Sequence, residues 1–254
     1  MLITAVVVPG PPAFVAELMG SAAHELDDLR QAADRAISLA LSDLVPASAD
    51  SPSESVQVVV VGPGEPGEFN AAGPVSFASF GRDVVVPALV EGQRSDRDLP
   101  TPIMLARYLA SRELAVHPDH GDLWASARWI TTSGADAAVL GAQLGEDGAR
   151  VALILVADGA ACHGPKAPRA EDARAQEYDD GVCAALGSGR PGELAQIDAD
   201  LGDELGATGP QIWPVLVAAA GGDLIGEVLW AGAPYGVGWA VASWRRSAAG
   251  APVN

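Results

Sequence analysis

Lysine is nearly absent from this 254-residue sequence. Of its 15 basic residues only Lys166 is a lysine, whereas Asp and Glu number 33, and the formal net charge is −18. Binding to nucleic-acid phosphates, or to an anionic membrane surface, requires clusters of Lys and Arg. The charge balance therefore predicts that neither nucleic acid nor a membrane is a partner of this protein.

Cysteine is also scarce, and long hydrophobic runs are missing. Cys162 and Cys183 are the two cysteines, and neither belongs to a Cys-x-x-Cys pair, which argues against a disulfide framework or a zinc ribbon. The segment Met1–Val8 has no basic residues before its apolar run, unlike a secretory signal peptide. No apolar stretch reaches the roughly 20 residues that cross a bilayer. We expect a cytoplasmic protein.

Hydrophobic residues, 49% of the chain, alternate between strand-like and helix-like patterns. The predicted strands are Leu2–Val8, Val56–Val61, Val84–Val86, Ala137–Leu140, Val151–Ala157, Glu227–Leu229 and Gly236–Ala242. The predicted helices are Ala22–Val45, Pro100–Arg112 with Asp98 as its cap, Glu171–Leu186, and one or two short helices in Pro191–Leu205, while Pro210–Ala220 is a buried helix or a strand. This alternation predicts one α/β domain over residues 1–246, with a central mostly parallel or mixed sheet and helices on both faces. Residues 247–254 are expected to form a frayed tail.

The segment Gly62–Gly67 has the Gly-x-Gly-x-x-Gly spacing of a dinucleotide-binding turn. Pro63 and Pro66 remove amide donors that a pyrophosphate would need, and Glu65 would repel it. No helix is predicted directly after this segment, so we interpret it as a surface turn. The sequence also contains no Gly-x-Ser-x-Gly elbow, Walker sequence or His-Glu-x-x-His pair.

Four histidines could take part in chemistry. His117 and His120 flank a proline and an aspartate, but no third metal ligand is near in sequence, so we interpret both as exposed loop residues. His24 is expected at the surface of the first long helix. His163 differs, because it follows a buried strand within a turn of small residues.

Asp158, His163 and Lys166 fall within nine residues after that strand. Open α/β sheets bind ligands at the carboxyl ends of their strands, so these side chains form a candidate general acid/base cluster. A capped, hydrogen-bonded turn explains the same spacing equally well. The sequence pattern alone leaves both interpretations open.

Three segments together resemble the LigB-type catalytic subunit of class III extradiol dioxygenases, which open catechol rings. They are Val8–Pro12 after the first strand, Asp158–Pro168, and Ala233–Trp244, and in order they span nearly the whole chain. The resemblance implies a LigB-like sandwich, Fe(II) as the family cofactor, and His163 as the acid/base. It also implies that Lys166 or Tyr235 would orient an anionic oxygen of a small aromatic substrate.

The sequence departs from the family where the iron ligands should be. Gly10 stands in place of the first histidine, and Gly62–Asn70, where the second should lie, contains none. Asp223 or Glu227 would be the third ligand. Since a facial triad needs two histidines and one carboxylate, we expect no metal and no other cofactor.

Two functional readings follow. In the first, the chain is a non-catalytic or diverged homologue whose metal-free cleft binds a small anionic or aromatic ligand, or a partner protein, without turnover. In the alternative, it is an active extradiol-type dioxygenase, or another enzyme acting on small aromatic substrates, with His163 as acid/base. Both readings expect Asp158, His163, Lys166 and Tyr235 to line a cleft beside Gly10.

Overall fold

A mixed sheet of seven strands runs through the centre of the protein. In the computed structural model, which describes residues 1–44 and 55–246, its strands are β1 (Leu2–Val8), β2 (Val56–Pro63), β3 (Gly67–Phe69), β6 (Arg128–Thr132), β7 (Arg150–Val156), β8 (Ile225–Gly232) and β9 (Trp239–Arg245). They lie in the order β3-β6-β2-β7-β1-β9-β8. The four strands β6, β2, β7 and β1 run parallel, whereas β3, β9 and β8 are antiparallel to their neighbours.

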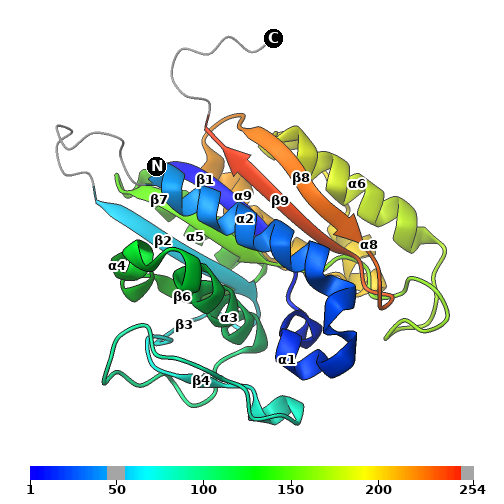
Figure 1. Cartoon of the computed structure of the whole chain (residues 1–254). Coiled ribbons are helices and arrows are strands. Elements are labelled where there is room, and N and C mark those ends of the chain that lie inside the picture. The colour runs from blue at the N-terminus through cyan, green and yellow to red at the C-terminus, as the bar shows by residue number, and fades with distance from the viewer. Residues whose placement is uncertain (45–54, 247–254) are drawn as a thin grey trace.

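Helices cover both faces of this sheet (Figure 1). The α-helices are α1 (Ala16–Met19), α2 (Asp27–Leu44), α3 (Thr101–Val116), α4 (Gly121–Ala125), α5 (Gly134–Glu146), α6 (Arg174–Ser188), α7 (Pro191–Leu194), α8 (Ala199–Leu205) and α9 (Trp213–Ala220). Short 3-10 helices are η1 (Pro12–Phe14), η2 (Gly20–Leu26), η3 (Ala78–Phe80), η4 (Pro118–His120) and η5 (Gly209–Gln211). Helices α2 and α3 pack on one face, and α5, α6 and α9 pack on the other. The predicted α/β class, with a mixed sheet between helices, is confirmed.

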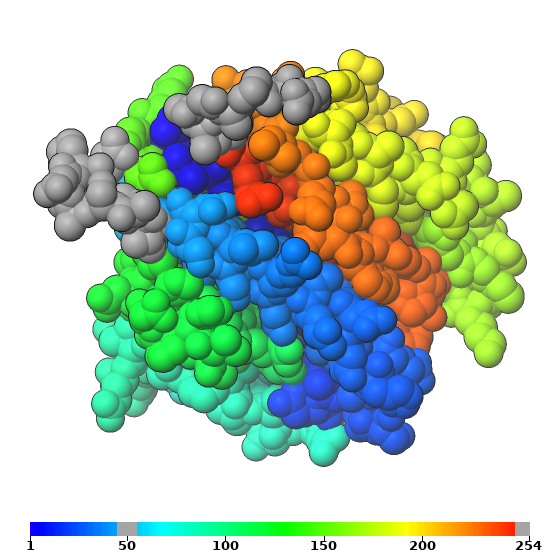
Figure 2. Space-filling model, turned by 45° about the horizontal axis from the view of Figure 1, so that its top comes forward, coloured from blue at the N-terminus to red at the C-terminus, as the bar shows by residue number. Residues whose placement is uncertain are grey.

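Burial on both faces explains why the central strands are continuous apolar runs in the sequence. Every residue of β1 is buried, because Val6 and Val8 face the α2 layer while Ala5 and Val7 face the α6 layer. A strand covered on both faces needs apolar residues at both alternating positions. Figure 2 shows the first of these layers, with the blue surface of α2 lying between the green helices and the orange strand β8.

Two predicted strands are wrong or incomplete. Ala137–Leu140 lies inside α5, where Ala137, Leu140 and Leu144 are buried at helical spacing. The predicted third strand shrinks to β5 (Val85–Val86), which pairs with β4 (Val75–Ser76) in a separate two-stranded sheet. Short apolar runs fit a helix face as well as a strand, so their periodicity could not decide between them. Strand β6, which contains two threonines and one tryptophan, was not predicted.

The ends of several elements also differ from expectation. Helix α3 begins at Thr101 behind Pro100, and no side chain caps it, so Asp98 is not its cap. Pro102 lies in the first turn of α3, a place that suits proline because the amide it lacks would be unpaired there. The segment Pro210–Ala220 resolves as helix α9, and the closing strand pair is present as β8 and β9. The turn predicted at Gly62–Gly67 is shorter than expected, because Gly62 and Pro63 end β2 and Gly67 begins β3, with no helix between the two strands.

His120 is not an exposed loop residue as predicted. It is only 7% exposed, and its Nδ1 lies 2.6 Å from the carboxylate of buried Glu113. The indole Nε1–H of Trp124 donates to the other oxygen of Glu113 at 2.9 Å. These three side chains form hydrogen bonds with one another where α3 meets α4, so His120 has a structural role. His24 is exposed, as expected.

Within the described ranges, no helix is both long and apolar enough to cross a membrane. The expected tail at 247–254 lies outside the described residues. The domain boundary at residue 246 therefore stays a prediction.

Candidate functional site: a pocket at the carboxyl edge of the sheet

Strands β1 and β7 end side by side at one edge of the sheet. Their parallel register pairs Val8 with Val156, so the loops that follow emerge next to each other. The backbone N–H of Gly10 donates to Oδ1 of Asp158 at 2.9 Å. Since β9 runs antiparallel to β1, its first residues reach the same edge, where the N–H of Gly159 donates to the carbonyl of Gly238 at 2.7 Å.

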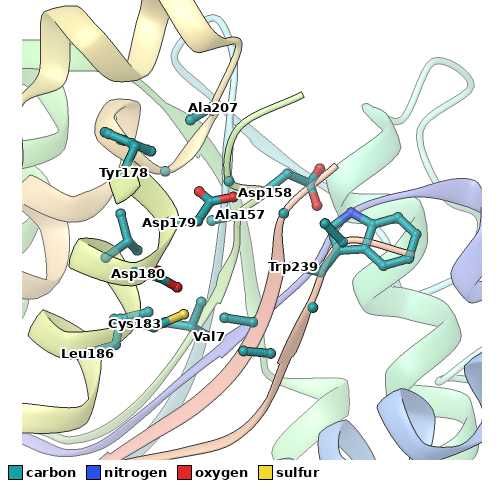
Figure 3. A pocket seen from close by; sticks show the side chains of 18 of the residues that line it. Val7, Ala157, Asp158, Tyr178, Asp179, Asp180, Cys183, Leu186, Ala207 and Trp239 are labelled. Carbon is teal, nitrogen blue, oxygen red and sulfur yellow. The ribbon is translucent and has the colours of Figure 1, made fainter. Parts of the chain in front are cut away.

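A pocket of about 170 Å³ opens at this edge, between the sheet and α6 (Figure 3). Apolar side chains of β1, α6 and β9 form part of its wall, namely Val7, Val182, Leu186 and Ala240. Polar residues of its lining include Asp158, His163, Gln176, Tyr178, Asp179, Asp180 and Cys183. The pocket is about as large as a protein cavity that accepts one benzene ring, roughly 150 Å³.

Asp158 lies where β7 gives way to its loop. Burial raises the pKa of its carboxyl group to about 6, and the hydrogen bond from Gly10 offsets only part of that rise. The backbone N–H of Asp158 donates to Oγ1 of Thr208, and the N–H of Thr208 donates to the Asp158 carbonyl, each at 2.9 Å. These bonds fix the residue's backbone, while no basic side chain in the described part of the chain pairs with its carboxyl group.

His163 and Asp179 form a second polar group in the pocket. Nε2 of His163 lies 2.6 Å from Oδ2 of Asp179, and the N–H of Ala160 donates to Oδ1 at 3.0 Å. Burial raises the pKa of Asp179, while the bonds from Ala160 and His163 act in the opposite direction. A Cβ at Gly238 would lie 1.7 Å from Oδ2, so only glycine leaves room for this carboxylate.

Three buried polar atoms of residues around the pocket have no hydrogen-bond partner among the described residues. They are the Tyr178 hydroxyl and the Nε1–H of Trp213, which lie on the α6 face of the sheet, and the Nε1–H of Trp239, whose ring packs on the α2 face. Burial also raises the pKa of the Tyr178 hydroxyl and raises that of the Cys183 thiol to about 11. Buried polar groups are normally paired, so unpaired donors beside a cavity indicate places where a ligand or water can bond.

A scan with protein-family models finds no match, and a comparison with curated proteins finds none. Among solved structures, the chain is similar to the uncharacterized protein JW3007 of Escherichia coli K12. The TM-score is 0.48 and the sequence identity 14%, and the superposition covers 95% of this chain and 99% of that one. This likeness carries no functional information.

The structure brings together only part of the predicted site. Asp158 and His163 both border the pocket. The Asp158 carboxyl group turns to the Val156 face of the sheet next to Gly10, whereas His163 meets Asp179 on the α6 face. Lys166 is exposed at the tip of its turn and does not line the pocket. The Tyr235 hydroxyl donates to Oε2 of Glu25 at 2.7 Å, and the Tyr235 ring packs edge-on against Trp239, outside the lining.

Asp179 and Trp239 were not among the predicted site residues. Asp179 sits in a helix whose charged residues read as a solvated face, and it is 16 residues from His163. Its inward neighbours Tyr178 and Val182 give a weak signal, because they place Asp179 at the border of the buried face. Trp239 begins a strand, and nothing in its sequence context distinguishes it from a core residue.

The side chains at this edge do not fit the family's iron site. Gly10 supplies no ligand atom, and a Cβ there would lie 3.0 Å from Cγ1 of Val156. A Cβ at Gly62 would lie 2.5 Å from Cβ of Pro102. Asp223 precedes β8 at the opposite edge of the sheet, and Glu227 is exposed. Within residues 1–44 and 55–246, no three His, Cys, Asp or Glu side chains are grouped as metal ligands.

Proposed function

We propose that this protein binds a small organic molecule in the pocket between the sheet and α6 without a transition metal, as a diverged, non-catalytic relative of the LigB-type dioxygenases. The observation that carries the proposal is the ring-sized cavity itself, which the apolar side chains of Val182 and Leu186 and the His163–Asp179 pair line together. Ligand sites typically combine apolar walls with a few polar groups in this way.

Cys183 offers a direct test, because its thiol lines the pocket. We expect a library of single-ring fragments, screened by ligand-observed NMR, to contain binders that slow alkylation of Cys183 by N-ethylmaleimide at pH 9. Protein already alkylated at Cys183 should lose these binders, whereas the Cys183→Ala variant should keep them after the same treatment. Fragments that bind equally well before and after alkylation would place binding elsewhere.

The His163–Asp179 pair supports a second candidate function, that of an enzyme that moves a proton on a small aromatic substrate. Asp179 can hold a proton on Nε2 of His163, which leaves the lone pair of Nδ1 as a base. Nδ1 would take the substrate proton and return it to the product. In this candidate His163→Asn abolishes turnover and leaves fragment binding intact, whereas a purely binding protein shows no turnover to lose.

We expect the protein to hold no stoichiometric iron or zinc. The reason is the donor set, since Gly10 and the segment Gly62–Asn70 offer no imidazole. Elemental analysis of protein purified anaerobically from iron-replete cells measures this directly. About one metal ion per chain retained after dialysis contradicts the prediction.

Ring cleavage of simple catechols is expected to stay at the background of free ferrous ion. The assay follows the yellow ring-opened product after addition of Fe(II) and air. Gly10→His alone should not raise the rate, because a second imidazole is still missing and the new side chain would press on Val156. Turnover above background in the unmodified protein would instead support the dioxygenase reading.

A further inference from the structure

The α6 wall of the pocket between the sheet and α6 is acidic. Asp179 and Asp180 both line the pocket, and none of the described residues that line it is Lys or Arg. Oδ2 of Asp179 bonds to His163, and Oδ1 accepts from the N–H of Ala160. Asp180 is exposed, and the side-chain amide of Gln176 donates to its Oδ1 at 2.9 Å. Because a carboxylate accepts about four hydrogen bonds, both groups keep lone pairs for a further donor.

Cys183 places the two carboxylates relative to the apolar part of the pocket. It follows Asp180 by three residues and Asp179 by four in α6, so the three side chains are neighbours on the helix surface. Figure 3 shows them one after another along α6. Val182 and Leu186, which are buried residues of the same helix, continue the wall. An apolar group that packs against Cys183 therefore has both carboxylates within reach of a short polar substituent.

The negative charge of this wall acts on the neutral groups that line the pocket. Burial, and then the charges of Asp179 and Asp180, raise the pKa of the Cys183 thiol to about 11. Burial, and then the charge of Asp179, also raise the pKa of the Tyr178 hydroxyl, which is buried and has no partner among the described residues. A nearby negative charge disfavours a second one, and it favours a positive charge for the same reason.

We infer that the ligand is a cation, namely a primary amine carried on a single-ring apolar body. Its ammonium group donates hydrogen bonds to Asp179 and Asp180, while its ring packs against Cys183, Val182 and Leu186. This inference rests on the proposed small-ligand function and specifies the charge of the ligand.

Anionic and neutral head groups fit the α6 wall less well. A carboxylate would be repelled by Asp179 and Asp180, and the described lining holds no Lys or Arg to compensate its charge. An alcohol donates one hydrogen bond, whereas an ammonium group donates three and adds an ionic attraction. Hydrogen bonds between ionised groups are roughly twice as strong as those between neutral groups. The charge of the head group is therefore the main source of selectivity.

Isothermal titration calorimetry at pH 7.5 tests the inference with benzylamine, benzyl alcohol and benzoate. These probes share one ring, which fits a cavity of about 170 Å³. Benzylamine is expected to bind about tenfold more tightly than either of the others. It should lose its binding to protein alkylated at Cys183 and keep it with Cys183→Ala after the same treatment.

Benzyl alcohol or benzoate binding as tightly as benzylamine overturns the inference but leaves the small-ligand function standing. Benzylamine that binds the alkylated protein equally well lies elsewhere, which also overturns the inference. If no probe binds, the fragment screen decides through those hits that alkylation of Cys183 abolishes. Positively charged hits of this kind support the inference, and neutral or negative ones overturn it. A screen that yields no such hit overturns the proposed function itself.

Asp180→Asn tests the ionic contact at an exposed position, where the substitution leaves the core untouched. It should weaken benzylamine about fivefold and leave benzyl alcohol unchanged, because only the cation loses an ionic partner. Glu177→Gln is the matched control, since it removes the same charge from an exposed position of α6 that does not line the pocket. Equal losses in the two variants, or no loss in Asp180→Asn, contradict the contact with Asp180.

Discussion

Replacing Arg107 with methionine is expected to lower the free energy of unfolding by about 3–5 kcal/mol, through loss of a buried hydrogen-bonded group. Arg107 lies on α3 with 0% exposure. Its Nε donates to the carbonyl of Ala71 at 2.5 Å, and its Nη2 donates to those of Gly73 and Pro87 at 3.2 and 2.8 Å. Methionine fills similar space but leaves these three carbonyls without their donors.

The same guanidinium group holds the long segment between β3 and α3, residues 70–100. This segment contains only the small β4–β5 sheet and one 3-10 helix, so few hydrogen bonds within its own backbone stabilise it. No carboxylate pairs with Arg107 among the described residues; its Cζ lies 5.7 Å from the centroid of the Trp129 ring. Burial lowers the pKa of Arg107 to about 10, which still leaves it charged at neutral pH.

Urea unfolding followed by circular dichroism measures the effect. Arg107→Lys should recover less than half of the lost stability, because an ammonium group cannot reach three carbonyls with the planar fork of a guanidinium. Arg35→Met, at an exposed position of α2, is the matched control and should change stability by no more than about 0.5 kcal/mol. If Arg107→Met lowers the free energy of unfolding by less than about 1 kcal/mol, other contacts hold the segment between β3 and α3.

Asp158→Asn is expected to stabilise the protein by about 1–3 kcal/mol at pH 7.5. The folded-state pKa of Asp158, about 6, lies above its ordinary value of 3.8 because burial disfavours the charged form. Between these two values the folded chain keeps a proton that the unfolded chain has lost. Stability contributed by this group is therefore present at low pH and is lost as the pH rises through the folded-state pKa.

The gain from Asp158→Asn should accordingly shrink toward zero as the pH falls to about 4, where both states of the wild-type residue are protonated. Thermal unfolding of both proteins between pH 4 and 8 gives the curve. Glu171→Gln, an exposed acid in the loop before α6, is the control and should show no comparable gain. A destabilised Asp158→Asn at pH 7.5 would mean that the hydrogen bond from Gly10 stabilises the charged carboxylate by more than its burial costs. A stabilising gain would identify Asp158 as a residue whose charge is costly to the fold, as is common at binding sites.

Much of the sheet could be predicted from the sequence. The strands Leu2–Val8 and Val151–Ala157 are apolar at every position, and only burial on both faces explains that pattern. The sequence did not predict β6, because Thr131 and Thr132 are polar residues, although both are buried. The run Ala137–Leu140 was assigned to a strand because four residues are too few to separate a helical period from an alternating one.

By itself, the sequence determined that the chain is an α/β protein, that Asp158 and His163 follow a central strand, and that Gly10 and Gly62–Asn70 provide no imidazole. These are local properties, set by hydrophobic periodicity and by residue identity. Only the tertiary structure decided that Asp179 of α6 meets His163, and that Lys166 and Tyr235 stay outside the pocket. Such pairings depend on the order and direction of strands and on the rotation of a helix about its axis. These contacts join residues that are far apart in the chain, so no local sequence pattern reveals them.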